Sequence, residues 1–161
     1  MVLKLEDLRV LKSAESLADS VWKEVSRWDT FSKKVVGSQF ARATDSIGAN
    51  IAESFGRYHY GEKLQFLYYA RGSLFEAKYW LNRAVARKLI DSEIAKSYAS
   101  QFSATAYQIN AFAKTIKKIR SGETEHSVLK ESGPVYHVRS EITPPDLFEE
   151  ESLQWLQTLD D

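Results

Sequence analysis

The chain contains no cysteine, and its 161 residues include only three prolines, seven glycines and one methionine. Without cysteine there is no disulfide framework, thiolate metal site, iron–sulfur cluster or cysteine nucleophile. Nowhere do about 18 uncharged apolar residues occur together, and no basic segment at the N-terminus leads into an apolar run. We therefore expect neither a membrane span nor a signal peptide, and the expected location is the cytoplasm.

The formal net charge is zero, but the two signs are unevenly distributed. Residues 1–120 hold 20 Lys+Arg and 12 Asp+Glu, a balance of +8, whereas residues 121–161 hold 2 and 10, a balance of −8. We therefore expect a basic body at 1–121, long enough for one compact core, and an acidic tail at 122–161. Such an imbalance bears on partners and association.

Hydrophobic periodicity predicts four long helices, because apolar residues recur every three or four positions and few breakers interrupt them. The expected helices span about 7–28, about 36–56, about 62–88 and about 91–121. Asp7 is the expected N-cap of the first helix, and Asp91-Ser92-Glu93 opens the last. Four helices joined by short turns predict an all-α, antiparallel up-and-down four-helix bundle.

The third helix carries two apolar stripes, where one would suffice for a monomeric bundle. A second stripe rich in aromatic residues needs another surface to bury it, because contiguous exposed apolar patches mark association sites. We therefore expect a homo-oligomer. The predicted interface residues are Phe66, Tyr69, Ser73, Ala77 and Trp80.

The acidic tail differs from the body in composition. Gly133-Pro134 and Thr143-Pro144-Pro145 break regular structure, and 135–138 has the pattern of a short extended piece. From 146 to 159 follows an acidic amphipathic run that we expect to fold only when docked. Its partner is either its own basic body or another protein. The apolar, partner-binding side consists of Leu147, Phe148, Trp155, Leu156 and Leu159.

Two motifs in the second and third predicted helices are specific. The first is Asn50-Ile51-Ala52-Glu53 followed by Phe55-Gly56-Arg57, and the second is Ala70-Arg71-Gly72-Ser73-Leu74. With their surroundings they resemble a four-helix-bundle family encoded within intervening sequences of large-subunit ribosomal RNA genes. That family includes the accessory variability protein of diversity-generating retroelements.

This resemblance implies a non-enzymatic bundle that assembles into a homopentamer-like ring with a positively charged surface suited to nucleic acid. In the retroelement members the ring also engages a reverse transcriptase. The sequence has Gly48 where the family commonly has proline, and Ser54 where it commonly has glycine. The acidic tail extends beyond the family's usual end.

Cations on the second and third helices are candidates for phosphate contacts, because releasing condensed counterions drives binding to nucleic acid. The segment Arg57-Tyr58-His59-Tyr60 adds rings and a guanidinium that can stack on unpaired bases. The alternatives are a solvated helix face and a turn whose aromatics cover the bundle end. The candidate residues for RNA or DNA are Arg42, Arg57, Tyr58, Tyr60, Lys63, Arg71, Lys78, Arg83, Arg87 and Lys88.

Four polar residues lie in the motif stretches and are expected to set helix register or subunit geometry: Asn50, Glu53, Arg71 and Glu76. A di-metal carboxylate site needs Glu-x-x-His pairs, and this sequence has none. Nucleophile elbows, phosphate loops and dinucleotide fingerprints are equally missing. We expect a scaffold without catalysis, cofactor or metal. The rival hypothesis is a protein–protein module whose tail docks on a partner or masks the basic body.

Overall fold

The computed structural model describes residues 4–122 and 147–159. Within these ranges every regular element is a helix and no strand occurs, which confirms the predicted all-α class. The expected breaks at 133–134 and 143–145, and the extended piece at 135–138, lie outside the described residues.

The chain begins with a short 3-10 turn, η1 (Leu5–Asp7), followed by α1 (Arg9–Val25). The prediction that Asp7 caps this helix is wrong, because Asp7 lies inside the turn. The extended residue Leu8 occupies the N-cap position and packs into the core, so burial of its side chain decides where α1 starts. Trp28 follows the end of α1 but is still buried, and its indole N–H donates to Glu24 Oε1 at 3.3 Å.

The second helical rod is continuous but not uniform. It consists of α2 (Thr30–Ser32), a π-helical stretch η2 (Lys33–Gly37) and α3 (Ser38–Gly56). Asp29 caps its start by accepting from the Ser32 N–H at 3.0 Å. A Cβ built on Gly37 would lie 2.5 Å from Val25 Cγ1, so the rod and α1 approach closely there. The wider π-turn coincides with this close approach.

The last two long helices are α4 (Tyr60–Ala86) and α5 (Ser92–Ser121). Lys88 ends α4 in the left-handed region with φ 57°, which lets the Leu89 N–H bond to Ala84 O at 2.9 Å. Asp91 caps α5 through the Ile94 N–H at 2.9 Å, and the helix starts where the sequence predicts. Gly122, with φ 76°, ends it in the conformation that glycine adopts without strain.

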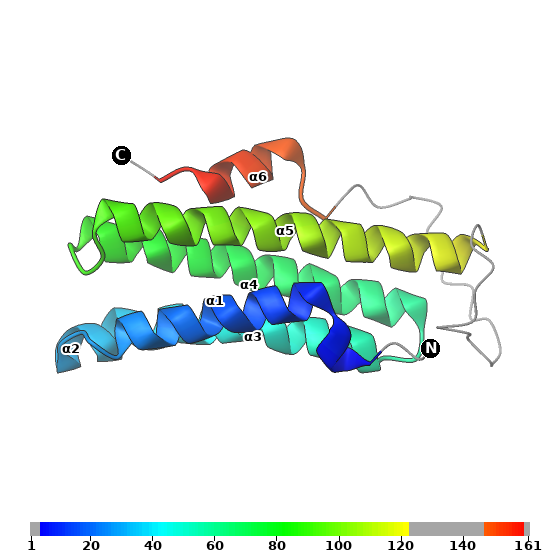
Figure 1. The fold of residues 1–161 in the computed structure, drawn as a ribbon, viewed down its shortest axis with the longest axis horizontal. Helices are drawn as coiled ribbons and strands as arrows, with labels where there is room; N and C mark the ends of the chain where they lie inside the picture. The colour runs from blue at the N-terminus through cyan, green and yellow to red at the C-terminus, as the bar shows by residue number, and fades with distance from the viewer. Residues whose placement is uncertain (1–3, 123–146, 160–161) are drawn as a thin grey trace.

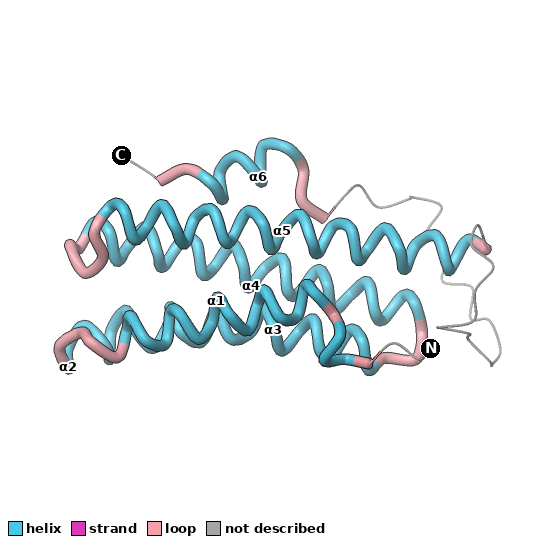
Figure 2. The backbone as a smooth tube through the Cα atoms, in the orientation of Figure 1, coloured by secondary structure: helices cyan, strands magenta, loops and turns pink. Residues whose placement is uncertain are grey.

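The four long helices lie side by side, and each runs opposite to the one before it (Figure 1). Both α1 and α4 contact α3 and α5, and short loops join the ends of these helices (Figure 2). One core fills the space between them, to which every long helix contributes fully buried side chains: Leu17, Phe40, Ile47, Leu67, Leu74, Phe102 and Ile109. A fifth helix, α6 (Glu150–Gln157), lies along the outside of α5 (Figure 1).

Gly37→Ala should lower the free energy of unfolding by about 1–3 kcal/mol, because the added methyl group meets Val25 in a packed interior. Gly61→Ala is the matched control, since a Cβ at that position would meet open space and the helix gains alanine's propensity. That control should raise the free energy by about 0.5–1 kcal/mol. Urea unfolding measures both, and a Gly37→Ala protein at least as stable as wild type would contradict the close approach.

Tyr98 ties α5 to α1, because its hydroxyl donates to Ser20 O at 3.0 Å. Burial, followed by the Glu24 carboxylate, raises the pKa of Tyr98 to about 12, while Arg27 opposes the shift. The folded state therefore keeps a proton that an unfolded tyrosine releases near pH 10. The stability that Tyr98 adds relative to Tyr98→Phe should be complete below about pH 10 and shrink between about pH 10 and 12. Thermal melts of both proteins across that range test this, and a constant difference would refute it.

Candidate nucleic-acid interface

Three of the ten predicted nucleic-acid residues are not on the surface. Tyr60, Lys63 and Lys78 are buried, so in this arrangement of the chain a polyanion cannot reach them. The Lys63 ammonium donates to Phe55 O at 2.9 Å and so satisfies a carbonyl at the end of α3. The periodicity that put these lysines on α4 did not show that their stems face the core.

The other seven do not form one patch. Arg57 and Tyr58 lie at the start of α4, and Arg87 and Lys88 lie at its end. With 27 residues, α4 is about 40 Å long. The remaining arginines, Arg42, Arg71 and Arg83, lie along α3 and α4 between the two ends. The prediction thus combined residues from two ends of the molecule.

Three of these arginines stack on rings of their own chain. The guanidinium carbons of Arg57 and Arg71 lie 4.6 Å from the ring centres of Phe66 and Phe75, respectively. That of Arg83 lies 5.9 Å from the ring centre of Tyr79. The rings that these guanidinium groups face belong to the protein itself and lie outside the predicted 57–60 segment.

The four residues of the predicted polar network are not brought together. Asn50 links α3 to α4 by donating to Ser73 Oγ at 3.3 Å, and Glu53 pairs with Arg57 one turn along. Among the described residues Arg71 has no ion pair with Glu53 or Glu76, because it turns toward the aromatic rings on the other side of α4. Asn50 does contact another helix, but its partner Ser73 is not a member of the predicted network.

The predicted oligomer stripe is largely used within one chain. Ala70, Ala77 and Ala84 are fully buried, while Phe66, Ser73 and Trp80 are half-buried. Of the five predicted interface residues, Tyr69 is the most exposed, at 50%, and on the same outward face of α4 Tyr79 is 52% exposed. Between these two tyrosines lies Gly72, where the surface is open.

A cluster that sequence reasoning missed lies where α1 ends and α2 begins. We call it the α2 end, and the turn between α4 and α5 lies at the same end of the molecule (Figure 1). Trp22 and Phe31 are 65% and 75% exposed, and Val35 follows Phe31 by one helical turn. Six exposed cations accompany them: Lys23, Arg27, Lys33, Lys34, Arg87 and Lys88.

Two acidic residues of the α2 end act as helix N-caps. Asp29 caps α2 and Asp91 caps α5, so each carboxylate is directed at helix N–H groups. Hydrogen bonds from the Ser32 hydroxyl and N–H lower the pKa of Asp29 below its usual value. The adjacent Phe31 and Lys33-Lys34 were a usable signal in the sequence, but our prediction counted cations on the second and third helices alone.

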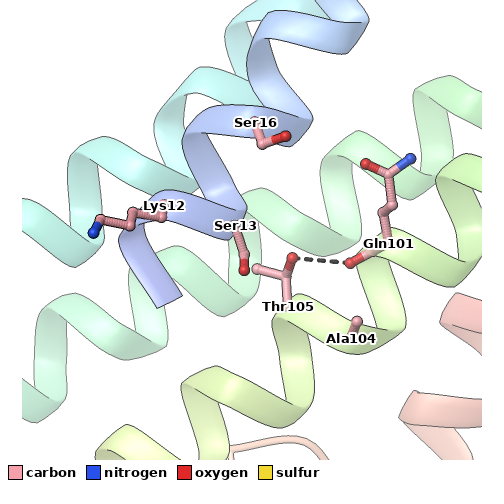
Figure 3. A pocket seen from close by; sticks show the side chains of 6 residues that line it. All are labelled: Lys12, Ser13, Ser16, Gln101, Ala104 and Thr105. Carbon is pink, nitrogen blue, oxygen red and sulfur yellow. Dashed lines mark hydrogen bonds between the residues drawn. The ribbon is translucent and has the colours of Figure 1, made fainter. Parts of the chain in front are cut away.

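An open hollow of about 300 Å³ lies between α1 and α5 (Figure 3). The Thr105 hydroxyl donates to Gln101 O at 2.9 Å, and the Lys12 side chain extends away from the hydroxyl groups (Figure 3). Lys12 is the ionisable residue of this lining, and its ammonium is directed away from the Ser13 and Thr105 hydroxyls (Figure 3). The lining consists of Lys12, Ser13, Ser16, Gln101, Ala104 and Thr105.

The described ranges contain neither a metal-binding cluster nor a membrane-spanning helix. No group of three or more His, Asp or Glu side chains there could hold a metal ion; His126 and His137 lie outside these ranges. None of the helices in 4–122 and 147–159 has the length and apolar character needed to cross a bilayer.

The C-terminal segment, residues 147–159, packs on its own chain. Leu147, Phe148 and Leu156, three of its five predicted contact residues, are buried, and Trp155 and Leu159 are half-buried against the same core. The Asn110 side chain on α5 donates to Phe148 O and accepts from the Phe148 N–H, both at 2.9 Å. Of the two expected partners, the structure contains the chain's own body.

These features define an all-helical protein with a basic body and a C-terminal segment seated on it. The chain belongs to the family of 23S rRNA-intervening sequence proteins, whose family model matches residues 6–111. A comparison with curated proteins gives no match. The matched region covers α1, α3, α4 and most of α5 and ends before the C-terminal segment.

Proposed function

We propose that this protein is a non-enzymatic, homo-oligomeric scaffold that binds RNA or DNA in the cytoplasm. Its framework is an antiparallel up-and-down four-helix bundle of α1, α3, α4 and α5. The observation that carries the proposal is the α2 end, where six exposed cations lie at the same end of the molecule as two exposed aromatic rings. Membership of a family named for ribosomal RNA intervening sequences supports a role beside nucleic acid.

The α2 end suits a single strand better than a duplex. Lysine and arginine neutralise phosphates and release counterions, which gives affinity without sequence preference. Trp22 and Phe31 present ring faces on which unpaired bases stack, and such stacking is absent in a closed duplex. In a ring of subunits several such ends act together, so weak single contacts suffice.

Lys33→Gln with Lys34→Gln should weaken binding of a labelled single-stranded RNA of about 20 nucleotides by about tenfold. The slope of log affinity against log salt should fall by about 1.4, because each phosphate contact to a single strand contributes about 0.7. Fluorescence anisotropy at salt concentrations between about 50 and 200 mM measures both quantities.

The matched control is Arg9→Gln with Lys12→Gln, which removes the same charge from exposed positions at the opposite end of α1. It should change affinity by less than about threefold, the weak effect expected of charges outside the contact region. Equal losses in the two double variants, or binding that ignores salt, would contradict an interface at the α2 end.

We place the subunit contact on the outward face of α4, around Tyr69, Gly72 and Tyr79. The two rings are half-exposed, and glycine between them allows another helix to come close. The proposed contact is smaller than the interface predicted from the sequence, because Ala77 is buried and Phe66, Ser73 and Trp80 are half-buried within the chain. We propose a ring of pentamer-like size, as the resemblance implies.

Tyr69→Glu with Tyr79→Glu should convert the oligomer to a monomer, since two carboxylates would have to be desolvated in the contact. Light scattering measures the mass of wild type and variant. Tyr107→Glu, at a tyrosine on α5 that is 53% exposed, serves as the control and should leave the oligomer intact. A monomeric wild-type protein would overturn this part of the proposal.

A ring that holds nucleic acid would serve a nucleic-acid enzyme, such as a reverse transcriptase, as an accessory protein. We propose this role because a scaffold without chemistry of its own acts through a partner. The second candidate function is a protein–protein module. It is favoured by the docking of the C-terminal segment, which covers part of α4 and α5.

A further inference from the structure

The surface under the C-terminal segment contacts both the aromatic rings and the backbone of that segment. Phe75 on α4 stacks on two rings of the segment, with centroids 6.0 Å from Phe148 and 5.3 Å from Trp155. The guanidinium carbon of Arg71 lies 5.8 Å from the Phe148 ring centre. One ring of the body thus packs against two aromatic side chains of the segment that are seven residues apart.

The same surface also binds the backbone of the segment at both of its ends. Asn110 makes paired hydrogen bonds with the N–H and carbonyl of Phe148. Lys78, fully buried, donates to Asn82 Oδ1 at 2.9 Å and to the carbonyl of Thr158, where α6 ends. These contacts fix register and direction, because a peptide shifted by one residue would lose them.

The glutamates of the segment do not hold it in place. Glu149, Glu150 and Glu151 are exposed, and within the described ranges none of them forms an ion pair with the body. The segment is therefore recognised through its apolar side, its backbone and two cations that face its rings: Arg71 lies over Phe148, and the Lys78 Nζ lies 5.3 Å from the Trp155 ring centre. This pattern of contacts does not require the occupant to be joined to the same body.

We propose that α4 and α5 form a peptide-binding groove, and that the groove can take the C-terminal segment of a second copy of this chain. Every groove contact named above lies on α4 or α5, so a segment from another copy would meet an identical site. The connection 123–146 has 24 residues. Fully extended it spans up to about 80 Å, twice the length of α4, and so reaches a neighbouring body.

Net charge does not oppose the meeting of two copies. Residues 1–120 carry +8 and residues 121–161 carry −8, so a body attracts the tail of another copy as it attracts its own. The occupant is the chain's own segment, because that is the peptide whose fit the structure shows. A foreign acidic amphipathic peptide would be a different occupant of the same groove.

The test uses two full-length variants with complementary defects. The groove variant, Phe75→Ser with Asn110→Leu, keeps its segment but loses the stacking ring and both backbone hydrogen bonds. The segment variant, Phe148→Ser with Trp155→Ser, keeps the groove but loses both rings. Neither can pair well with itself, whereas a mixture contains one intact groove and one intact segment.

Native mass spectrometry of differently tagged variants, mixed at about 100 μM, detects complexes with micromolar dissociation constants. We expect the mixture to form a mixed complex at least about tenfold more abundant than two tagged segment variants mixed together. Every protein in both mixtures also carries Tyr69→Glu with Tyr79→Glu, which removes pairing through the outward face of α4, so the result is separate from the proposed ring. Equal abundance in the two mixtures would overturn the exchange.

A peptide with the sequence of residues 146–161 gives an independent measurement. Added to the segment variant, it should bind, and its Phe148→Ser form should bind at least about tenfold more weakly. Circular dichroism confirms that the segment variant keeps its helices. A segment variant that binds neither peptide would show that the groove does not act in trans and would overturn the proposal.

Discussion

Burial of α4 on more than one side is the constraint on which the rest of the structure depends. Small residues on one flank, such as Ala77, let α3 come close, and Leu67 and Leu74 fill the shared core. On the other flank Phe75 and Lys78 are covered by the C-terminal segment. A helix buried in this way leaves only a narrow outward strip, and that strip limits where a second subunit can bind.

Burial of the helices also influences where the charged side chains lie. The long helices bury their apolar sides in the middle of the molecule, and many exposed cations lie near the helix ends. At the α2 end they accompany Trp22 and Phe31, which the core does not cover. The buried Lys63 and Lys78 show the opposite outcome, in which a cation satisfies carbonyl groups inside the fold. The positive potential of the surface therefore cannot be estimated from the number of lysines and arginines in the sequence.

The sequence predicted the helices well, because periodicity is a local property. The start of α5 was confirmed, since the Asp91 side chain that caps it needs only the N–H groups of the next turn. The cap at Asp7 was wrong because the burial of Leu8, a tertiary contact, sets the start of α1. The predicted polar network was wrong for a similar reason. Asn50 and Arg71 both lie in the sequence motifs, but Asn50 contacts Ser73 whereas Arg71 faces the Phe148 ring.

The all-α class, the long helices, the basic body and the amphipathic pattern at 147–159 follow from the sequence alone, because each depends on residue spacing and charge. Only the tertiary structure decided which cations reach solvent, which flank of α4 is covered and where the C-terminal segment docks. Those outcomes depend on which side chains from distant parts of the chain meet. Asn110 and Phe148 lie 38 positions apart, and no local pattern links them before the chain folds.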